Sequence, residues 1–302
     1  MAHPAVFQIC ASAALIAAMS LAWPARGRAQ DAPVEESTYE TTRGMAMGSG
    51  VRASGLGTSA ISYNPAALAL SKLYHLESAA GYDPKDGGWW IGGAAADSVT
   101  STVAAGMSFR GVFNHEEANY DGYDGRLALA VPLADVLAIG VTGRFVKLRP
   151  EKQDGMAEPV ADKGVKGFTM DASVGVQPVP GLHIAAIGHN LVDRDSALTP
   201  MLVGGSIAYS YENMFSIGGE GFADLSTFED PEVIAGGGME FFAGGVAPLR
   251  LGYRYDSGRG IHSVTGGIGY VDEEVGLDLS LRQAVDGASD TRLVAGFRYH
   301  VQ

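Results

Sequence analysis

Residues able to do chemistry are scattered along this chain rather than gathered into a recognisable motif. The 302 residues include seven histidines, spread through the sequence, and one cysteine, Cys10, near the amino terminus. Nucleophilic catalysis needs a serine or cysteine beside a base, and a zinc site needs clustered histidines or cysteines. His262 and Ser263 are adjacent, so on a strand their side chains would face opposite sides. We therefore predict no enzyme, no cofactor and no metal site.

Charged residues of both signs recur in the second half of the chain, where they alternate with apolar residues. On strands they would share one polar face. Neighbouring strands would bring Glu240 close to Arg250 or Arg254. The last two strands would bring Asp278 or Arg282 toward Arg298. We favour cross-strand ion pairs inside a closed lumen over the alternative, a polar channel. The charges expected to face inward are Glu220, Glu240, Arg250, Arg254, Asp278, Arg282, Arg292 and Arg298.

The elements expected to position these charges are short strands. In "LRLGYRYD" (249–256) and "VGLDLSLR" (275–282), apolar residues alternate with polar residues or glycine. A period of two gives a strand one apolar and one polar face. After the amino-terminal segment, no apolar run approaches the roughly 18 residues of a membrane-spanning helix. We predict about fourteen strands, at 74–82, 88–96, 101–113, 124–133, 136–148, 166–177, 181–191, 201–211, 214–223, 232–243, 247–256, 261–270, 274–283 and 291–301.

The links between the predicted strands alternate in length. Every other link is short, such as 133–136, and most of the remaining ones are longer and more polar, such as 149–164. Outer-membrane barrels have short periplasmic turns and long external loops. A soluble β-sandwich would explain the alternation of residues but not the rhythm of the links. The sequence thus predicts an all-β fold, a transmembrane antiparallel β-barrel of about 14 strands in the bacterial outer membrane.

The amino terminus predicts export. Residues 5–23 are apolar and are followed by "PARGRAQDA", which resembles a secretory signal peptide cleaved after Ala29. An uncleaved membrane anchor is the alternative. The net charge of −13 and the pI near 4.9 argue against nucleic acid as a partner. We expect a signal peptide at 1–29, a plug or hatch at 30–72 and an outer-membrane barrel at 73–302.

The segment before the first strand has the composition of a luminal plug. A barrel of about fourteen strands is wider than the eight-stranded kind that side chains can fill. Residues 30–72 are rich in glycine, which lets a compact, non-repetitive backbone thread among strands. The pair Asn64-Pro65 would fix an extended or turn geometry. We expect this segment to occupy the lumen from the periplasmic side.

Two stretches carry a resemblance to a known superfamily. "RGMAMGSGVRASGLGTSAISYNPAALA" (43–69) resembles the amino-terminal signature of the FadL/TodX long-chain fatty-acid and hydrocarbon transporters and of their compact PorV-type relatives. "IGHNLVD" (187–193) looks like that superfamily's mid-barrel Asn-Leu strand end. The resemblance implies a movable hatch whose ligand or hinge residues are Tyr63, Asn64, Pro65, Gly48 and Gly50. The alternative is that this segment caps the barrel and never moves.

Glycines cluster on two neighbouring predicted strands. Glycine inside a strand marks a bulge, a bend or a close approach by another backbone. In a transporter of the resembled type, this weakness would open a lateral gap through which an apolar ligand leaves. We favour the alternative, that the glycines make room for the plug. They are Gly218, Gly219, Gly236, Gly237 and Gly238.

The resemblance implies passive uptake of hydrophobic small molecules such as long-chain fatty acids. The alternative is a PorV-like accessory barrel that binds a secreted or surface protein and transports nothing. An apolar pocket between plug and wall would favour transport, and a filled lumen with large ordered outer loops would favour protein binding. The expected partners are outer-membrane lipid and lipopolysaccharide, together with the hydrophobic ligand or the secreted protein.

Overall fold

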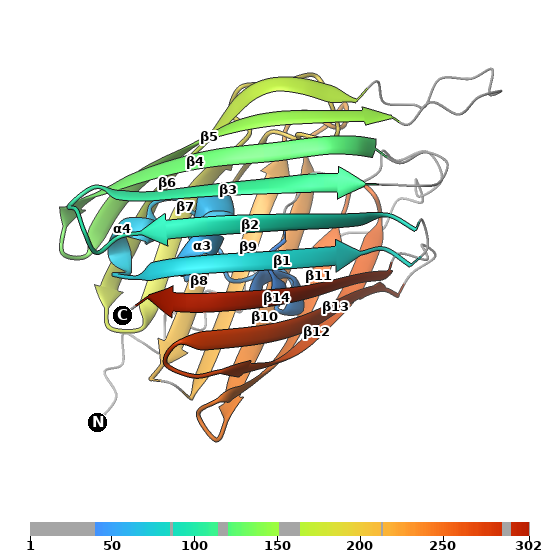
Figure 1. The fold of residues 1–302 in the computed structure, drawn as a ribbon. Helices are drawn as coiled ribbons and strands as arrows, with labels where there is room; N and C mark the ends of the chain where they lie inside the picture. Colours follow the sequence, from blue (N-terminus) through green and yellow to red (C-terminus); the bar gives the residue numbers. More distant parts are fainter. Residues whose placement is uncertain are drawn as a thin grey trace, which may run out of the picture.

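The segments in which apolar and polar residues alternate form a closed wall of fourteen antiparallel strands (Figure 1). The computed structural model describes residues 40–84, 87–113, 120–150, 164–212, 214–285 and 291–301, so the predicted signal peptide lies outside the described residues. Strand β1 pairs with β14, with Tyr74 opposite Val301, and this pairing closes the sheet into a barrel. The predicted fold class is confirmed. The strands are β1 (Tyr74–Tyr82), β2 (Trp89–Asp97), β3 (Ala104–Phe113), β4 (Tyr120–Ala134), β5 (Leu137–Pro150), β6 (Val165–Val179), β7 (Leu182–His189), β8 (Leu202–Tyr211), β9 (Phe215–Asp224), β10 (Glu232–Ala243), β11 (Ala247–Asp256), β12 (Ile261–Val271), β13 (Val275–Ala284) and β14 (Thr291–Val301).

For four strands the predicted bounds agree with the structure to the residue. Strands β1, β10, β11 and β14 begin and end at the predicted residues. Strand β4 instead begins at Tyr120, where the sequence predicted 124, because its first residues pair with the end of β5, Tyr120 opposite Pro150. Backbone pairing does not require apolar side chains. The strands therefore continue beyond the band that the alternation marks.

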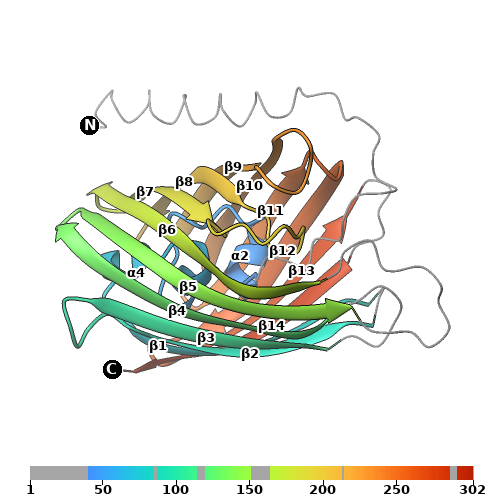
Figure 2. The same ribbon diagram turned by 90° about the horizontal axis from the view of Figure 1, so that it is seen from above.

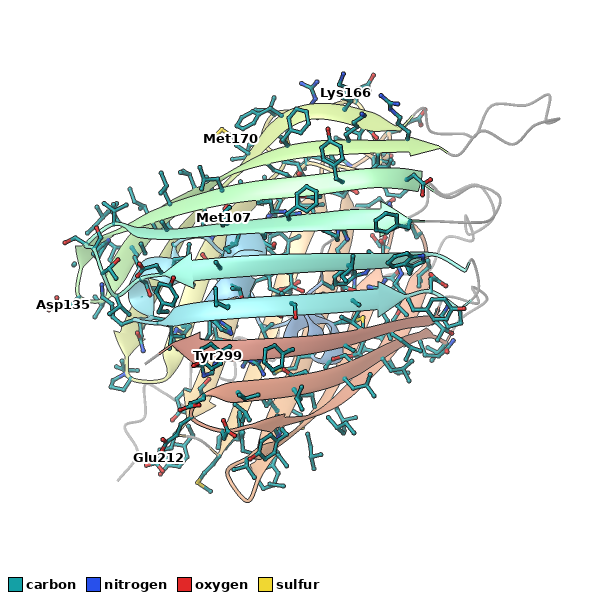
Figure 3. All side chains as sticks on the ribbon, viewed as in Figure 1. Met107, Asp135, Lys166, Met170, Glu212 and Tyr299 are labelled. Carbon is teal, nitrogen blue, oxygen red and sulfur yellow. The ribbon has the colours of Figure 1, made fainter. Side chains whose placement is uncertain are left out.

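The wall has its apolar face outside and its polar face inside, the reverse of a soluble protein. On β11, Leu251 is 66% exposed, whereas the neighbouring Arg250 is 3% exposed. Side chains cover the outer surface in Figure 3, with Met107 near the middle of the wall and Asp135 and Glu212 in turns at the same end as the carboxy terminus. An outward apolar band around a closed barrel is the pattern of a protein of the bacterial outer membrane. Within the described residues, no helix is long and apolar enough to cross a membrane.

Residues 40–72, called the luminal segment from here on, lie inside the barrel (Figure 2). They contain three short helices, α2 (Thr42–Ala46), α3 (Thr58–Tyr63) and α4 (Ala67–Leu70). Helix α2 contacts β11 to β14, while α3 and α4 contact β1 to β6 on the other side of the lumen. The segment therefore spans the interior.

Alanines on the inner face of the wall allow α3 and α4 to pack against it. The apolar side chains of Ile61 and Leu68 belong to a buried cluster with strand alanines. A methyl group is the smallest side chain that still covers backbone, so helices can approach the sheet closely. The strand residues of this cluster are Ala96, Ala104, Ala128, Ala130 and Ala138.

Candidate functional site

The candidate site is the lumen of the barrel, where a solute could be bound. The luminal segment occupies part of it, and its helices are joined by hydrogen bonds. Thr41 caps α2, because its Oγ1 accepts a hydrogen bond from Gly44 N at 3.1 Å. The backbone N of Thr41 donates to the hydroxyl oxygen of Tyr63 at 3.1 Å, which joins α2 to the end of α3. Burial raises the pKa of Tyr63 to about 12, so its hydroxyl stays neutral at physiological pH.

Hydroxyl groups on the wall satisfy the irregular backbone of this segment. Thr265 on β12 accepts from Gly48 N at 3.0 Å and donates to the carbonyl of Ala46 at 2.9 Å. Serine and threonine can do both, because a hydroxyl is donor and acceptor. Buried backbone groups outside helices need such partners. Four further hydroxyls act alike: Ser280 toward Thr42 O, Thr142 toward Ile61 O, Ser206 from Ala53 N and Ser173 from Ala66 N.

Glycines let the segment and the wall meet backbone to backbone. A Cβ atom on Gly50 would lie 2.7 Å from both Gly218 O on β9 and Gly237 Cα on β10. A Cβ on Gly238 would lie 2.6 Å from Met47 Cα. Contacts this short do not occur between real side chains and backbone, so only glycine fits at both surfaces.

One cluster of buried charges, the Glu240 cluster, fixes the segment to strands β10 to β14. Glu240 Oε1 lies 3.0 Å from Arg43 Nη2 of the segment, and its Oε2 lies 2.6 Å from Arg250 Nε. Asp278 bridges Arg250 and Arg298. Each carboxylate therefore serves two guanidinium groups, which is the arrangement that offsets the cost of burying them.

Glu40, at the start of the described chain, forms a second link to the wall. Its Oε1 lies 3.1 Å from Arg254 Nη1, and its Oε2 lies 2.7 Å from Arg282 Nη1. Ser49 Oγ donates to the same carboxylate at 3.1 Å. The charge of one segment residue thus holds strands β11 and β13 together from inside.

The Asp124 cluster lies on the other side of the lumen, on β3, β4 and β5. Asp124 lies 3.1 Å from Arg126 Nε, 2.6 Å from Arg144 Nη2 and 3.8 Å from Arg110 Nη2. All four side chains are almost completely buried. A second carboxylate, Asp171 on β6, lies 3.7 Å from Arg126 Nη1.

Asn190 connects the Asp124 cluster to β6 and to the link between β7 and β8. It directly follows β7 and has a positive φ of 52°, a conformation that asparagine tolerates better than most residues. Its Oδ1 accepts from Arg144 Nη1, its backbone N donates to Asp171 Oδ1 and its Nδ2 donates to Pro200 O, each at 2.8 Å. The amide therefore ties three elements together.

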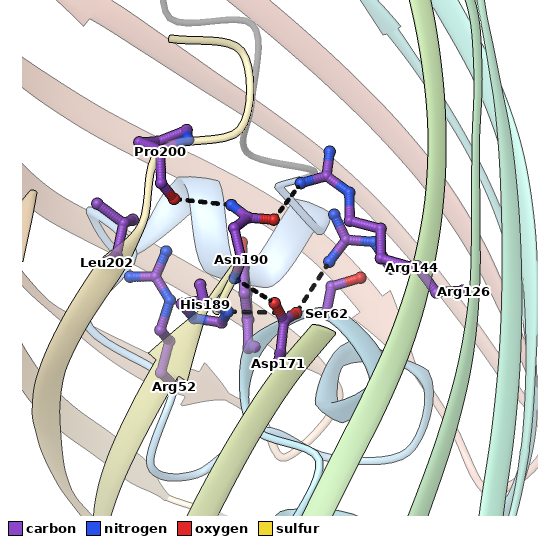
Figure 4. A pocket seen from close by; sticks show the side chains of 10 residues that line it. Arg52, Ser62, Arg126, Arg144, Asp171, His189, Asn190, Pro200 and Leu202 are labelled. Carbon is purple, nitrogen blue, oxygen red and sulfur yellow. Dashed lines mark hydrogen bonds and ion pairs between the residues drawn. The ribbon is translucent and has the colours of Figure 1, made fainter. Parts of the chain in front are cut away.

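A small polar cavity lies beside Asn190 (Figure 4). Its empty volume is about 320 Å³, part of which is open space. Arginine, serine and histidine side chains line it together with one carboxylate, so it offers charge and hydrogen bonds beside the apolar surface of Pro200 and Leu202. The charged and hydroxyl-bearing lining residues include Arg52, Ser62, Arg126, Arg144, Asp171 and His189.

Apolar side chains lie beyond this cavity, toward the end of the barrel that carries the longer links. On β5 the inner face continues from Arg144 to Val146 and Leu148. Leu198, from the link between β7 and β8, packs on these residues, and Trp90 covers them from β2. This outer apolar cluster is formed by Val112, Val146, Leu148, Val165 and Leu198.

The comparisons with known proteins place the fold. No family model matches the chain, and no curated sequence matches it. Solved structures match along most of its length. The Ralstonia pickettii toluene transporter TbuX is 13% identical, with a TM-score of 0.59 over 88% of this chain and 99% of that one. A Pseudomonas aeruginosa FadL homologue is 11% identical, with a TM-score of 0.57 over 88% and 97%.

A third match is the Pseudomonas putida toluene transporter TodX, 11% identical, with a TM-score of 0.55 over 88% of this chain and 99% of that one. The chain has the FadL/TodX barrel fold. The resemblance first seen in the glycine-rich and Asn-Pro stretches is confirmed at the level of the fold. The match extends over nearly the whole of each relative.

Within this FadL-type barrel, most of the charges expected to face inward are buried. Glu240 pairs with Arg250, whereas Arg254 contacts Glu40 of the luminal segment. Glu220 pairs with Arg52, another residue of the segment. Arg292 lies apart from these groups, 3.7 Å from Asp83 and partly exposed. The segment therefore neutralises several wall charges that the sequence alone would pair across strands.

Of the residues expected to form a hinge, Asn64 and Pro65 lie against strands β6 and β5, whereas Tyr63 contacts Thr41 and Arg52 within the luminal segment. Asn64 is fully buried, and Tyr63 is almost so. A Cβ on Gly140 would lie 2.8 Å from Pro65 O, so the backbone of this turn rests directly on the wall. Movement of these three residues stays a prediction.

The glycines expected to permit lateral opening sit in continuous strand pairing. Gly218 is opposite Gly238, and Gly219 is opposite Gly237, in an unbroken register between β9 and β10. Gly236 approaches the carbonyl of Gly48. All of these glycines except Gly219 contact the luminal segment, and opening of the wall at this point stays a prediction.

Sequence reasoning missed the Asp124 cluster. Its signal is present in "YDGRLALAV" (123–131), where Asp124, Arg126, Ala128 and Ala130 alternate with other residues. The missed contributions of Glu40, Arg43 and Arg52 left no such signal, because an irregular segment has no periodicity from which a facing direction follows.

Proposed function

We propose that this barrel allows small hydrophobic molecules, such as monoaromatic hydrocarbons or long-chain fatty acids, to cross the outer membrane passively. The observation that carries the proposal is the fold shared with the toluene transporters TbuX and TodX over 88% of the chain. The outer apolar cluster gives further support, since an apolar solute arriving from outside would meet it before the charged layer. Movement of the luminal segment would then open the way inward.

The first experiment measures uptake in cells. The protein is expressed in a Gram-negative host that lacks its own fatty-acid channel, and entry of labelled oleate and of labelled toluene is followed. We expect uptake above that of the host with an empty vector. Surface expression and folding are checked by the change in gel mobility on heating. A folded, surface-located barrel that admits neither compound would contradict the proposal.

A second experiment observes binding directly. The barrel beginning at residue 30 is refolded with Trp89 replaced by phenylalanine, so that Trp90 reports on the outer apolar cluster that it covers. Trp89 itself stacks on Phe113, with ring centroids 4.4 Å apart, and phenylalanine preserves that stacking. Oleate or toluene should change the emission of Trp90 saturably. An unchanged spectrum in a folded protein would argue against entry by this route.

A specific observation favours a second candidate function, a non-transporting barrel that binds a secreted or surface protein. The luminal segment is held by buried ion pairs and by backbone contacts, and charged side chains line the cavity beside it. A filled lumen suits a scaffold. Deleting the gene in its native host and measuring the surface level of secreted proteins tests it. Loss of one such protein, with no change in hydrocarbon uptake, would favour this role.

A further inference from the structure

Two lysines face each other on the outer surface of the wall. Lys147 on β5 is directly opposite Lys166 on β6. Val146 and Leu148 on either side of Lys147 are buried, so the side chain of Lys147 points outward. Lys166 points outward for the same reason, since Val165 before it is buried. Like charges directly opposite each other destabilise a sheet, so this pair is unfavourable unless an anion lies close to both.

Two arginines extend the lysine pair into a larger basic patch. Arg149 lies two residues beyond Lys147 on the same face of β5. Arg194, in the link after β7, donates from Nη2 to the carbonyl of Lys166 at 3.2 Å. Both arginines are exposed. The basic patch is formed by Lys147, Arg149, Lys166 and Arg194.

The carboxylates near this patch accompany its arginines. Asp121 on β4 is opposite Arg149. Asp193 and Asp195 flank Arg194 in the sequence. Within the described part of the chain, none of the three forms an ion pair with a lysine of the patch. The two lysines therefore keep their charge available to an anion from outside the chain.

The other described cations of the barrel are used differently. Among the described residues, every lysine or arginine outside the patch belongs to an ion pair, with the exception of Lys72 just before β1. The chain as a whole has a net charge of −13. Cations that are left without an ion pair thus gather at one place on the outer surface.

Aromatic rings continue this outer surface from the patch toward the middle of the wall. Phe145 is opposite Phe168, the next outward pair along β5 and β6, and the two side chains are 43% and 52% exposed. Tyr123 on β4 stacks toward Phe145, with ring centroids 6.2 Å apart. Lys147 Nζ lies 5.6 Å from the centroid of the Tyr123 ring. Aromatic girdles of barrels lie at the level of the lipid head groups, which places the patch at the same level or just outside it.

The patch lies toward the end of the barrel that carries the longer links. The links after β5 and β7 begin close to it, since these strands end at Pro150 and His189. In Figure 3, Lys166 lies farther than Met170 from Asp135, which is in the short turn between β4 and β5. Long links face the outside of the cell in outer-membrane barrels. The patch therefore meets the outer leaflet, whose lipopolysaccharide carries phosphate groups on its lipid A.

We propose that the basic patch binds a phosphate group of lipid A, which lies between Lys147 and Lys166. The phosphate turns the repulsion between the two lysines into attraction to a shared anion. Arg149 and Arg194 supply further donors, and the acyl chains lie along Phe145 and the rings beside it. Lysine and arginine both bind phosphate, and basic pockets on membrane proteins bind lipid head groups. The site does not depend on the passage of hydrocarbons, and it serves a scaffold as well as a channel.

The test measures the thermal midpoint of the barrel beginning at residue 30, refolded in detergent and mixed with increasing mole fractions of lipid. The probes are bisphosphorylated lipid A and the same lipid with its phosphates removed. Binding to the folded state raises the midpoint, and its concentration dependence gives the dissociation constant. The wild type should bind the phosphorylated lipid about tenfold more tightly than the dephosphorylated one, because only the first offers charge to the patch.

The variant that tests the lysines combines Lys147→Gln with Lys166→Gln. It should weaken binding of the phosphorylated lipid by about tenfold or more and leave binding of the dephosphorylated lipid unchanged. Lys72→Gln is the matched control, since Lys72 is also exposed but precedes β1, at the end of the barrel with the short turns. It should bind both lipids like the wild type.

Detergent without lipid A gives a second, independent reading. Lys166→Gln removes the repulsion between the two lysines, so in detergent alone it should not lower the midpoint. The rival is an internal counter-ion, a carboxylate from the acidic link at 151–163, which lies outside the described residues. In that case Lys166→Gln would break an ion pair, and the midpoint would fall. Such a fall would overturn the proposal.

The lipid measurements also support or overturn the proposal. Preference for the phosphorylated lipid that is lost in the double variant and kept in Lys72→Gln supports it. Equal binding of the two lipids by the wild type, or an equal loss in both variants, would overturn it and leave the lysines as solvated groups at the membrane surface. Uptake of oleate and toluene is measured separately, so a failure here is distinct from a failure of the proposed function.

Discussion

Asn190 connects three parts of the polar structure in the lumen. Its amide joins Arg144 on β5, the carbonyl of Pro200 before β8 and, through the backbone, Asp171 on β6. Its φ of 52° is one that a β-branched or bulky residue would adopt only under strain. The stretch "IGHNLVD" that carried a family resemblance therefore has a physical reason to contain asparagine at this position.

The pair of variants Asn190→Gly and Asn190→Ala separates hydrogen bonding from backbone strain. Both lose the bonds to Arg144 and Pro200, and both should lower the free energy of unfolding. Alanine should lower it by about 1 kcal/mol more than glycine, because only alanine pays for the positive φ. Urea unfolding in detergent, followed by the fluorescence of Trp89 and Trp90, measures the difference. Equal values for the two variants would show that strain is unimportant here.

Gly50 tests the backbone contact between the luminal segment and the wall. Gly50→Ala places a methyl group against Gly218 O and Gly237 Cα, two backbone atoms that cannot move aside separately. We expect a loss of about 1–3 kcal/mol, the usual cost of overpacking. Gly221→Ala is the control, since its Cβ would meet nothing within 4 Å. The fraction that refolds, read from heat-dependent gel mobility, should fall for the first variant alone.

At the residue scale, the sequence predicted which charged side chains face the lumen, but it did not predict which residues they pair with. Alternation predicted that Glu240, Arg250 and Asp278 share one face, and the structure buries all three. It did not predict that Glu40 would contact Arg254 and Arg282, because that contact depends on the path of a segment with no period. The ion-pair partners of charged wall residues therefore depend on the segment that occupies the lumen.

At the scale of elements, the luminal segment is joined to the wall by polar and backbone contacts as well as by the apolar cluster around α3 and α4. Its helices are too short to be stable alone, since isolated helices below about 12 residues are marginal in water. Wall hydroxyls and buried ion pairs supply what the helices lack. The strands, by contrast, were predictable from alternation, because each one pairs through its whole length with neighbours in the sheet.

Glu40 is the test of this anchoring. Glu40→Gln leaves Arg254 and Arg282 short of one buried negative charge, and we expect it to destabilise the barrel by about 3 kcal/mol. Glu229→Gln, an exposed change in the link between β9 and β10, should have little effect. Adding Arg282→Gln to Glu40→Gln should cost less than the sum of the single changes, because the charges are coupled. Strict additivity in urea unfolding would contradict the ion pair's importance.

At the scale of the whole molecule, the barrel presents apolar side chains to lipid on its outer face and pairs charged side chains with one another on its inner face. Leu251→Arg puts a charge on the outer face in the middle of β11, where leucine is 66% exposed. In lipid vesicles this should cost about 2–4 kcal/mol, the range for arginine near the bilayer centre. Val99→Arg, in the turn between β2 and β3, is the control, as its side chain is exposed beyond the strands. A similar loss at both positions would argue against the membrane band.

The movement of the luminal segment decides between a hatch and a fixed cap. Ala53 N donates to Ser206 Oγ at 3.0 Å, so cysteines at these positions, Ala53→Cys and Ser206→Cys, should form a disulfide during oxidative refolding. If hydrophobic solutes pass by displacement of the segment, the oxidised protein should lose most of its oleate uptake, and reduction should restore it. Each single cysteine variant controls for the substitutions. Uptake that is the same in the oxidised and reduced proteins would mean that the segment stays in place while solutes pass.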